Sequence, residues 1–145
     1  MREIKFRVWA IDWKDNNLNS PQGKMMYCEH RDFAWLGETA IENTSRYIVM
    51  QFTGLTDKNG KEIYKGDVIL IPSSYTEMIT DDGGESQDSP QIQEVIFHKG
   101  SFGIVAEKDD LFSKRFYSFY EIEQEITDNP IEVIGNIYSN PELIK

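Results

Sequence analysis

The chain is 145 residues long, carries a formal net charge of −10 and contains one cysteine. This length corresponds to about one domain, with a core large enough to need no metal or disulfide. A single cysteine forms no intramolecular disulfide, and no apolar run approaches the roughly 18 residues that a membrane-spanning helix needs. We therefore expect a protein of the reducing cytoplasm with no membrane association.

The charge is unevenly distributed along the chain. Residues 1–75 hold ten Lys and Arg against ten Asp and Glu, whereas residues 76–145 hold five against fifteen. Proteins that bind DNA through its phosphates need Lys and Arg to displace counterions, and an acidic surface opposes that approach. The composition therefore disfavours nucleic acid as a partner.

The N-terminal part of the chain predicts a β hairpin. Its first strand alternates, which places Ile4, Phe6 and Val8 on one face. Residues 12–22 are rich in loop-forming residues and precede a second strand over Lys24–Cys28. Residues 29–44 show little periodicity, and we expect irregular structure with at most one helical turn. Together these elements define a predicted β subdomain over residues 1–45.

The next segment predicts a strand followed by a tight turn. Residues 46–53 alternate with the period of a β-strand, and we expect Gly54 to end that strand. Residues 57–60 then contain Asn59-Gly60, the dipeptide best suited to the positive backbone angles of a tight reversal. This region begins the main predicted domain, residues 46–145.

A second turn and a core strand follow. Lys65-Gly66-Asp67 predicts the turn, in which the Asp67 carboxylate accepts backbone N–H bonds that set the next strand. Residues 68–71 form a continuous apolar run that Pro72 stops, as expected of a core strand.

Two ligand-binding interpretations of this segment fail on spacing. A phosphate-binding loop needs Gly, four residues, Gly-Lys and then Ser or Thr. Here five residues separate Gly54 from Gly60, and Glu62 follows Lys61. A calcium-binding EF-hand loop needs its glycine at the sixth position, whereas Gly60 lies three residues after Asp57. We therefore expect no cofactor and no metal here.

The second half of the chain begins with an acidic stretch. Residues 73–90 contain five acids and no bases, and we interpret residues 76–91 as a mobile acidic loop. Residues 92–97 and 102–106 then predict the two arms of a hairpin, joined by a turn over residues 98–101.

The C-terminal region is less regular. Residues 111–126 fit either a helix or a strand, and we favour a strand or irregular structure over residues 115–120. Residues 131–134 predict a short strand. Asn140 followed by Pro141 is typical of a helix start, with room for about one turn.

Three blocks of sequence occur in order along the chain: MREIKFRVW over residues 1–9, QFTGLTDKNGKEIYKGDV over residues 51–68, and EVIGNIYSNPELI over residues 132–144. Together they resemble the YopX family, which is encoded largely by phages and prophages of bacteria and is unrelated to the secreted Yop effectors. The resemblance implies a mainly β fold with minor α, in which an N-terminal β-rich subdomain precedes an SH3-like small barrel. It implies no activity. The block residues to which we assign structural roles are Gly54, Asp57, Asn59, Gly60, Gly66, Asp67, Gly135, Asn136, Asn140 and Pro141.

One cluster of potential ligands or catalytic groups surrounds the cysteine. Cys28 and His30 lie beside Glu29 and Asp32, but zinc needs about four placed ligands and the other histidine, His98, is distant in sequence. A nucleophile and base formed by cysteine and histidine would lack a third orienting group. We assign no catalytic and no metal-binding residues.

These observations favour a non-enzymatic protein that binds a host protein, a phage protein or itself. Many short strands leave sheet edges that pairing between subunits would satisfy, which favours a homo-oligomer. Two alternatives stay open: a nucleic-acid-associated regulatory protein, supported by Arg2, Lys5 and Arg7, and an enzyme with a site assembled from loops. The aromatic residues available to a binding surface are Trp9, Trp13, Trp35, Phe112, Phe116, Tyr117, Phe119 and Tyr120.

Overall fold

A computed structural model of the chain describes residues 3–11, 23–28, 32–72, 90–107, 114–125 and 130–144. It divides into two compact units, Met1–Gly54 and Leu55–Lys145. The division lies inside a strand and differs from the expected one at residues 45 and 46, because the first half of that strand pairs with the N-terminal sheet. The acidic segment 76–91 lies almost wholly outside the described residues.

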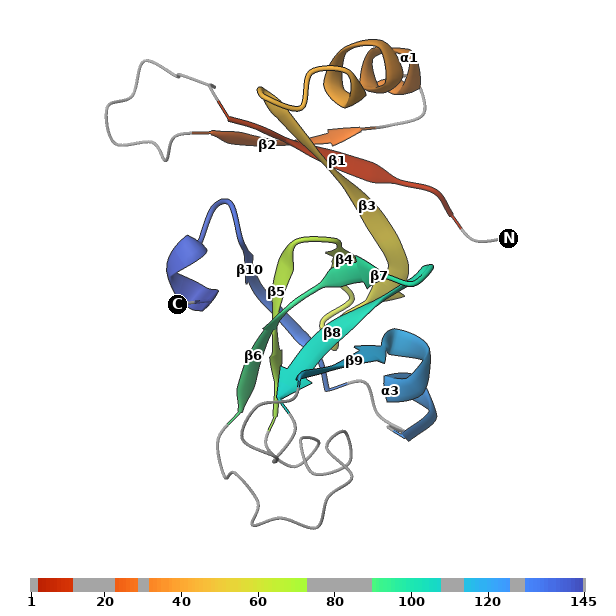
Figure 1. Cartoon of the computed structure of the whole chain (residues 1–145), viewed down its shortest axis with the longest axis vertical. Helices are drawn as coiled ribbons and strands as arrows, with labels where there is room; N and C mark the ends of the chain where they lie inside the picture. The colour runs from red at the N-terminus through yellow and green to blue at the C-terminus, as the bar shows by residue number, and fades with distance from the viewer. Residues whose placement is uncertain are drawn as a thin grey trace. The chain divides into compact units, whose positions relative to one another are not determined.

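The first unit is built on an antiparallel sheet in which β1 (Phe6–Ala10) lies between β2 (Lys24–Cys28) and β3 (Tyr47–Thr56) (Figure 1). In this register Val8 is opposite both Met26 and Val49. The predicted N-terminal hairpin is therefore confirmed.

The segment between β2 and β3 contains more helix than the sequence predicted. A short α1 (Phe33–Trp35) continues as the π-helical segment η2 (Leu36–Ile41). Leu36 and Ala40, four residues apart, are buried against Val8 of the sheet. The expectation of irregular structure was wrong because Leu36 and Ala40 are enough to bury one face of the helical segment against the sheet.

Strand β3 does not end at Gly54, as the sequence suggested, but continues to Thr56. Gly54 has a backbone φ of 92°, a value that L-residues with a side chain rarely adopt. The glycine therefore lets the strand continue through a backbone conformation that other residues disfavour. The next strand, β4 (Glu62–Tyr64), follows β3 in the sheet order.

The second unit contains two three-stranded sheets that curl around one core. The sheet orders are β10-β5-β6 and β7-β8-β9. The single residue Val95, which is fully buried, separates β6 from β7, so one bent strand serves both sheets (Figure 1). The strand bounds are β5 Asp67–Ile71, β6 Gln91–Glu94, β7 Ile96–His98, β8 Ser101–Glu107, β9 Lys114–Ser118 and β10 Glu132–Asn136.

The core of this unit is shared by both sheets and by helix α3 (Phe119–Glu125). Ile69 of β5, Ile104 of β8 and Ile122 of α3 belong to the same buried cluster. A short 3₁₀ turn, η3 (Pro141–Ile144), follows β10, as the Asn-Pro signal predicted. The predicted mainly β fold with minor α is confirmed, and the sheets of the second unit curl into a half-barrel.

Residues 114–125 resolve the ambiguous segment into a strand followed by a helix. Ser118 ends β9 and caps α3: its N–H and hydroxyl both donate to Glu121 Oε2 at 2.8 Å, and the Glu121 N–H donates to Ser118 Oγ at 3.2 Å. This reciprocal pair is a capping box, with serine at the cap and glutamate three residues later. The predicted strand is confirmed for residues 115–118, whereas Phe119 and Tyr120, which the prediction also included, begin the helix that this capping box starts.

The turn between β7 and β8 is the two-residue reversal that the sequence predicted. Lys99 and Gly100 have φ values of 47° and 84°, and His98 pairs with Ser101 across the turn. Two successive positive φ values are typical of a type I′ turn, which matches the twist of the flanking strands.

Candidate functional site

The central turn of the second sequence block is held against the C-terminal strand by one carboxylate. Asp57 Oδ1 accepts the N–H groups of Asn59 and Lys61 at 2.8 and 2.9 Å, and Oδ2 accepts the N–H of Val133 at 3.0 Å. The Lys58 N–H also donates to the Ile131 carbonyl at 2.9 Å. The turn and β10 therefore form one hydrogen-bonded unit.

The electrostatics of Asp57 agree with this structural role. The residue is only 5 % exposed, and burial by itself would raise its pKa. The backbone N–H groups of Val133, Lys61 and Asn59 outweigh that effect, so the pKa of Asp57 lies below its ordinary value. The carboxylate is thus held ionised as an acceptor. Asn59 itself shows no positive φ; that conformation is taken by Gly60, at 80°.

The second turn contributes a similar anchor. Asp67 is 1 % exposed, and its Oδ2 accepts the Tyr64 N–H at 2.8 Å. The sequence predicted that this carboxylate accepts backbone N–H bonds, and the Tyr64 N–H, which precedes the turn, is one such donor. The carbonyl of Gly66 accepts the N–H of Ile137, which follows β10, at 3.0 Å.

In the third block, Asn136 at the end of β10 binds the backbone of the residues that follow it. Asn136 Oδ1 accepts the N–H of Ser139 at 2.9 Å, and the Asn140 N–H donates to the Asn136 carbonyl at the same distance. A Cβ added to Gly135 would lie 2.7 Å from Asn140 Oδ1, so a larger residue there would require the Asn140 side chain to shift. Pro141 begins η3 directly afterwards. The polar and glycine residues of the second and third blocks described above thus hold the scaffold together, and none of them lines the pocket described next.

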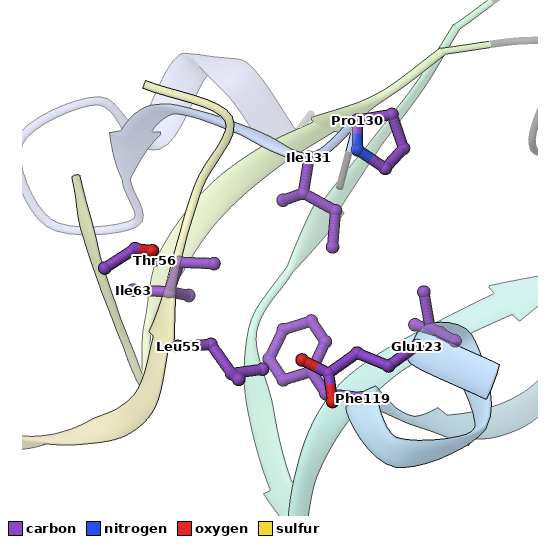
Figure 2. A pocket seen from close by; sticks show the side chains of 8 residues that line it. Leu55, Thr56, Ile63, Phe119, Glu123, Pro130 and Ile131 are labelled. Carbon is purple, nitrogen blue, oxygen red and sulfur yellow. The ribbon is translucent and has the colours of Figure 1, made fainter. Parts of the chain in front are cut away.

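The second unit, Leu55–Lys145, which we call the barrel unit, contains a small apolar pocket that the sequence did not predict. Its walls come from the end of β3, from β4, from α3 and from the residues just before β10 (Figure 2). The lining residues are Leu55, Thr56, Ile63, Phe119, Ile122, Glu123, Pro130 and Ile131. Recognition of the Ser118 capping box would have placed Phe119 and Ile122 on one helix face and so pointed to one wall.

The pocket combines an apolar floor with a charged rim. Ile63, Phe119, Ile122 and Ile131 are buried, whereas Thr56 and Glu123 are exposed. Figure 2 shows the Glu123 side chain reaching from α3 alongside the Phe119 ring. The cavity volume is about 40 Å³, which is about three times the volume that one buried water molecule requires. The space therefore suits a group of a few carbon atoms.

Other residues singled out in the sequence are dispersed. Cys28 is half-buried, and burial followed by the nearby Asp32 charge raises the pKa of its thiol, which disfavours the reactive thiolate. His30 and Trp13 lie outside the described residues. Arg7 is 3 % exposed and its Nη2 lies 3.6 Å from Met50 Sδ, so it does not present a cationic strand face to nucleic acid.

The aromatic residues divide between core and surface. Tyr117 and Phe119 are buried, whereas Tyr120 is exposed and Phe116 is half-buried with its ring centroid 5.1 Å from that of His98. Phe97 of β7 is 51 % exposed, although its ring packs edge-on against Phe102. The predicted aromatic cluster is therefore in part core rather than one binding surface.

Two features are absent from the described residues. None of the helices described has the length and apolar character that crossing a membrane requires. In the same ranges, no three His, Cys, Asp or Glu side chains gather as a metal site would require.

The family model described as YopX protein matches residues 5–145. The crystal structure of protein EF1440 from Enterococcus faecalis is similar, with a TM-score of 0.50 and 23 % identity over 100 % of both chains, a likeness that shows the fold alone. No curated protein matches the chain. Because the family match covers nearly the whole sequence, the chain belongs to the YopX family.

Proposed function

We propose that the chain is a phage- or prophage-encoded, non-enzymatic protein-binding module of the host cytoplasm, and that it receives an apolar side chain of its partner in the barrel pocket. The observation that supports this proposal is the pocket itself, with buried isoleucine and phenylalanine walls and a partly exposed leucine at its edge. Apolar side chains that enter such pockets are the usual anchors of protein interfaces.

The size and chemistry of the pocket support binding more than catalysis. It has room for a few carbon atoms, and the polar side chains that line it are Thr56 and Glu123, both exposed. General acid–base catalysis calls for a positioned group with a tuned pKa, usually obtained by burial. An enzyme with a site assembled from loops therefore gains no support from this pocket.

Selection of peptides on the intact chain tests the proposal. A random peptide library is displayed, bound peptides are recovered, and the strongest is titrated into protein labelled at isoleucine methyl groups. Ile63, Ile122 and Ile131 line the pocket, whereas Ile41, Ile48 and Ile92 do not, so the two sets serve as probe and control. We expect shifts concentrated in the first set. Shifts confined to the second set, or a library that yields no binder, would contradict the proposal.

Self-association is a second candidate, supported by exposed aromatic side chains on strands at sheet edges. Phe97 lies on β7 and Tyr27, which is 66 % exposed, lies on β2; each strand ends its sheet in the strand order. Edge strands with apolar side chains are prone to pair with another chain. Light scattering over a concentration series should then show a mass above that of one chain, and a constant monomer mass would count against it.

A further inference from the structure

We propose that the partner segment is basic: the apolar side chain that fills the pocket is accompanied by a Lys or Arg whose cation pairs with Glu123. This inference rests on the proposed function and specifies the chemistry of the partner at the same site.

The first argument is the state of the Glu123 carboxylate. Figure 2 shows it at the pocket, beside Phe119. Within the part of the chain that the structure describes, Glu123 has neither a hydrogen bond nor an ion pair. Its helix neighbour Glu121, by contrast, accepts bonds from Ser118 and lies 3.4 Å from Arg115. The pocket rim therefore carries a carboxylate that none of the described residues engages.

The second argument is the absence of a cation among the pocket residues. None of the eight lining side chains is basic. The described basic residues of the turn and of β9 already have partners, since Lys58 lies 2.5 Å from Glu132 and Arg115 contacts Glu121. A cation for Glu123 can therefore be supplied by the molecule that fills the pocket.

The third argument is the charge of the whole unit. Residues 55–145 hold eight Lys and Arg against eighteen Asp and Glu, so the barrel unit carries the entire net charge of −10. Such a charge accelerates encounter with a basic partner and opposes approach of a second copy of the same unit. The occupant is accordingly a basic segment of another protein.

Three small probes that share one hydrocarbon group separate the apolar contribution from the ionic one. 3-Methylbutan-1-amine is a cation, 3-methylbutan-1-ol is neutral and 3-methylbutanoate is an anion at pH 7. Each is titrated into the full chain, and the methyl signals of Ile63, Ile122 and Ile131 report binding at the pocket. We expect the amine to bind about two- to fivefold more tightly than the alcohol, the range for an exposed ion pair, and the carboxylate to bind most weakly.

Two variants assign the preference to one carboxylate. Glu123 is exposed, so Glu123→Gln should fold normally and bind the amine and the alcohol equally. Glu142→Gln removes the same charge from an exposed residue outside the pocket lining and should keep the preference.

The outcomes distinguish the inference from the function on which it rests. Preference for the amine that Glu123→Gln abolishes supports the inference. Equal binding of amine and alcohol to the wild-type pocket overturns the inference and leaves the pocket as a binding site. If no probe shifts the three isoleucine signals, the pocket does not bind such groups, and both proposals fall.

Discussion

Replacing Asp57 with alanine tests whether one carboxylate holds the central turn to β10. The change removes the acceptor of three backbone N–H groups. Asn59 and Lys61 are exposed, so water replaces the acceptor and each loss costs about 0.5 kcal/mol. Val133 is buried, and its unsatisfied N–H costs about 1–3 kcal/mol. We therefore expect Asp57→Ala to lower the free energy of unfolding by about 2–4 kcal/mol.

Urea denaturation at pH 7 measures this loss, with Glu38→Ala, which removes an exposed carboxylate of η2, as the control. Amide hydrogen exchange supplies a local readout, since the Val133 amide should exchange faster in the Asp57 variant. A loss below about 0.5 kcal/mol, the value of a single weak hydrogen bond, would refute the assignment of Asp57 as the anchor.

The same variant predicts a pH dependence. Because the pKa of Asp57 is lower in the folded chain than in the unfolded one, its ionic stabilisation is complete above the unfolded pKa, about 3.9. It is lost as the pH falls through the folded pKa. The difference in unfolding free energy between wild type and Asp57→Ala should therefore shrink below about pH 4. A difference that stays constant into acid would contradict an ionised acceptor.

Three further changes are predicted, each checked by thermal denaturation. Ser118→Ala removes the reciprocal cap with Glu121 and should cost about 1 kcal/mol; an unchanged midpoint would argue against the cap. Lys99→Asn should raise the midpoint, because asparagine tolerates the left-handed φ of 47° better than lysine; a lower midpoint would contradict this. Burial raises the pKa of Glu94 against the opposing charge of Lys65, so Glu94→Gln should stabilise the fold at pH 7. That gain should vanish below about pH 4, where glutamate is protonated in both states, and a gain at acid pH equal to that at pH 7 would refute it.

The sequence predicted elements whose signals are local. Asn59-Gly60 and Lys99-Gly100 mark reversals because glycine supplies a positive φ within the turn itself. Alternation predicted β1 and β3 because a strand with a buried face repeats every two residues. The same kind of local signal fails at Gly54. The glycine predicts the end of the strand, whereas β3 continues through it to Thr56.

Helices were predicted less well for a different reason. The η2 segment buries Leu36 and Ala40, a face too narrow to produce a clear period in sequence. Helix α3 carried a start signal in Ser118 and Glu121, but aromatic residues on both sides of that boundary fit a strand equally well. Packing rather than local preference decides both segments: η2 packs against Val8 of the N-terminal sheet, and α3 packs into the core of the second unit.

The sequence by itself determined the family, the β class and the turns, since motif blocks, alternation and turn residues are each recognised within short runs of consecutive residues. Only the tertiary structure decided that Asp57 binds the backbone of Val133, 76 residues away. It alone also assembled the pocket from β3, β4, α3 and the approach to β10. The physical reason is that hydrogen bonds and apolar contacts between distant segments depend on how the chain folds back in space, and no local period in the sequence records that path.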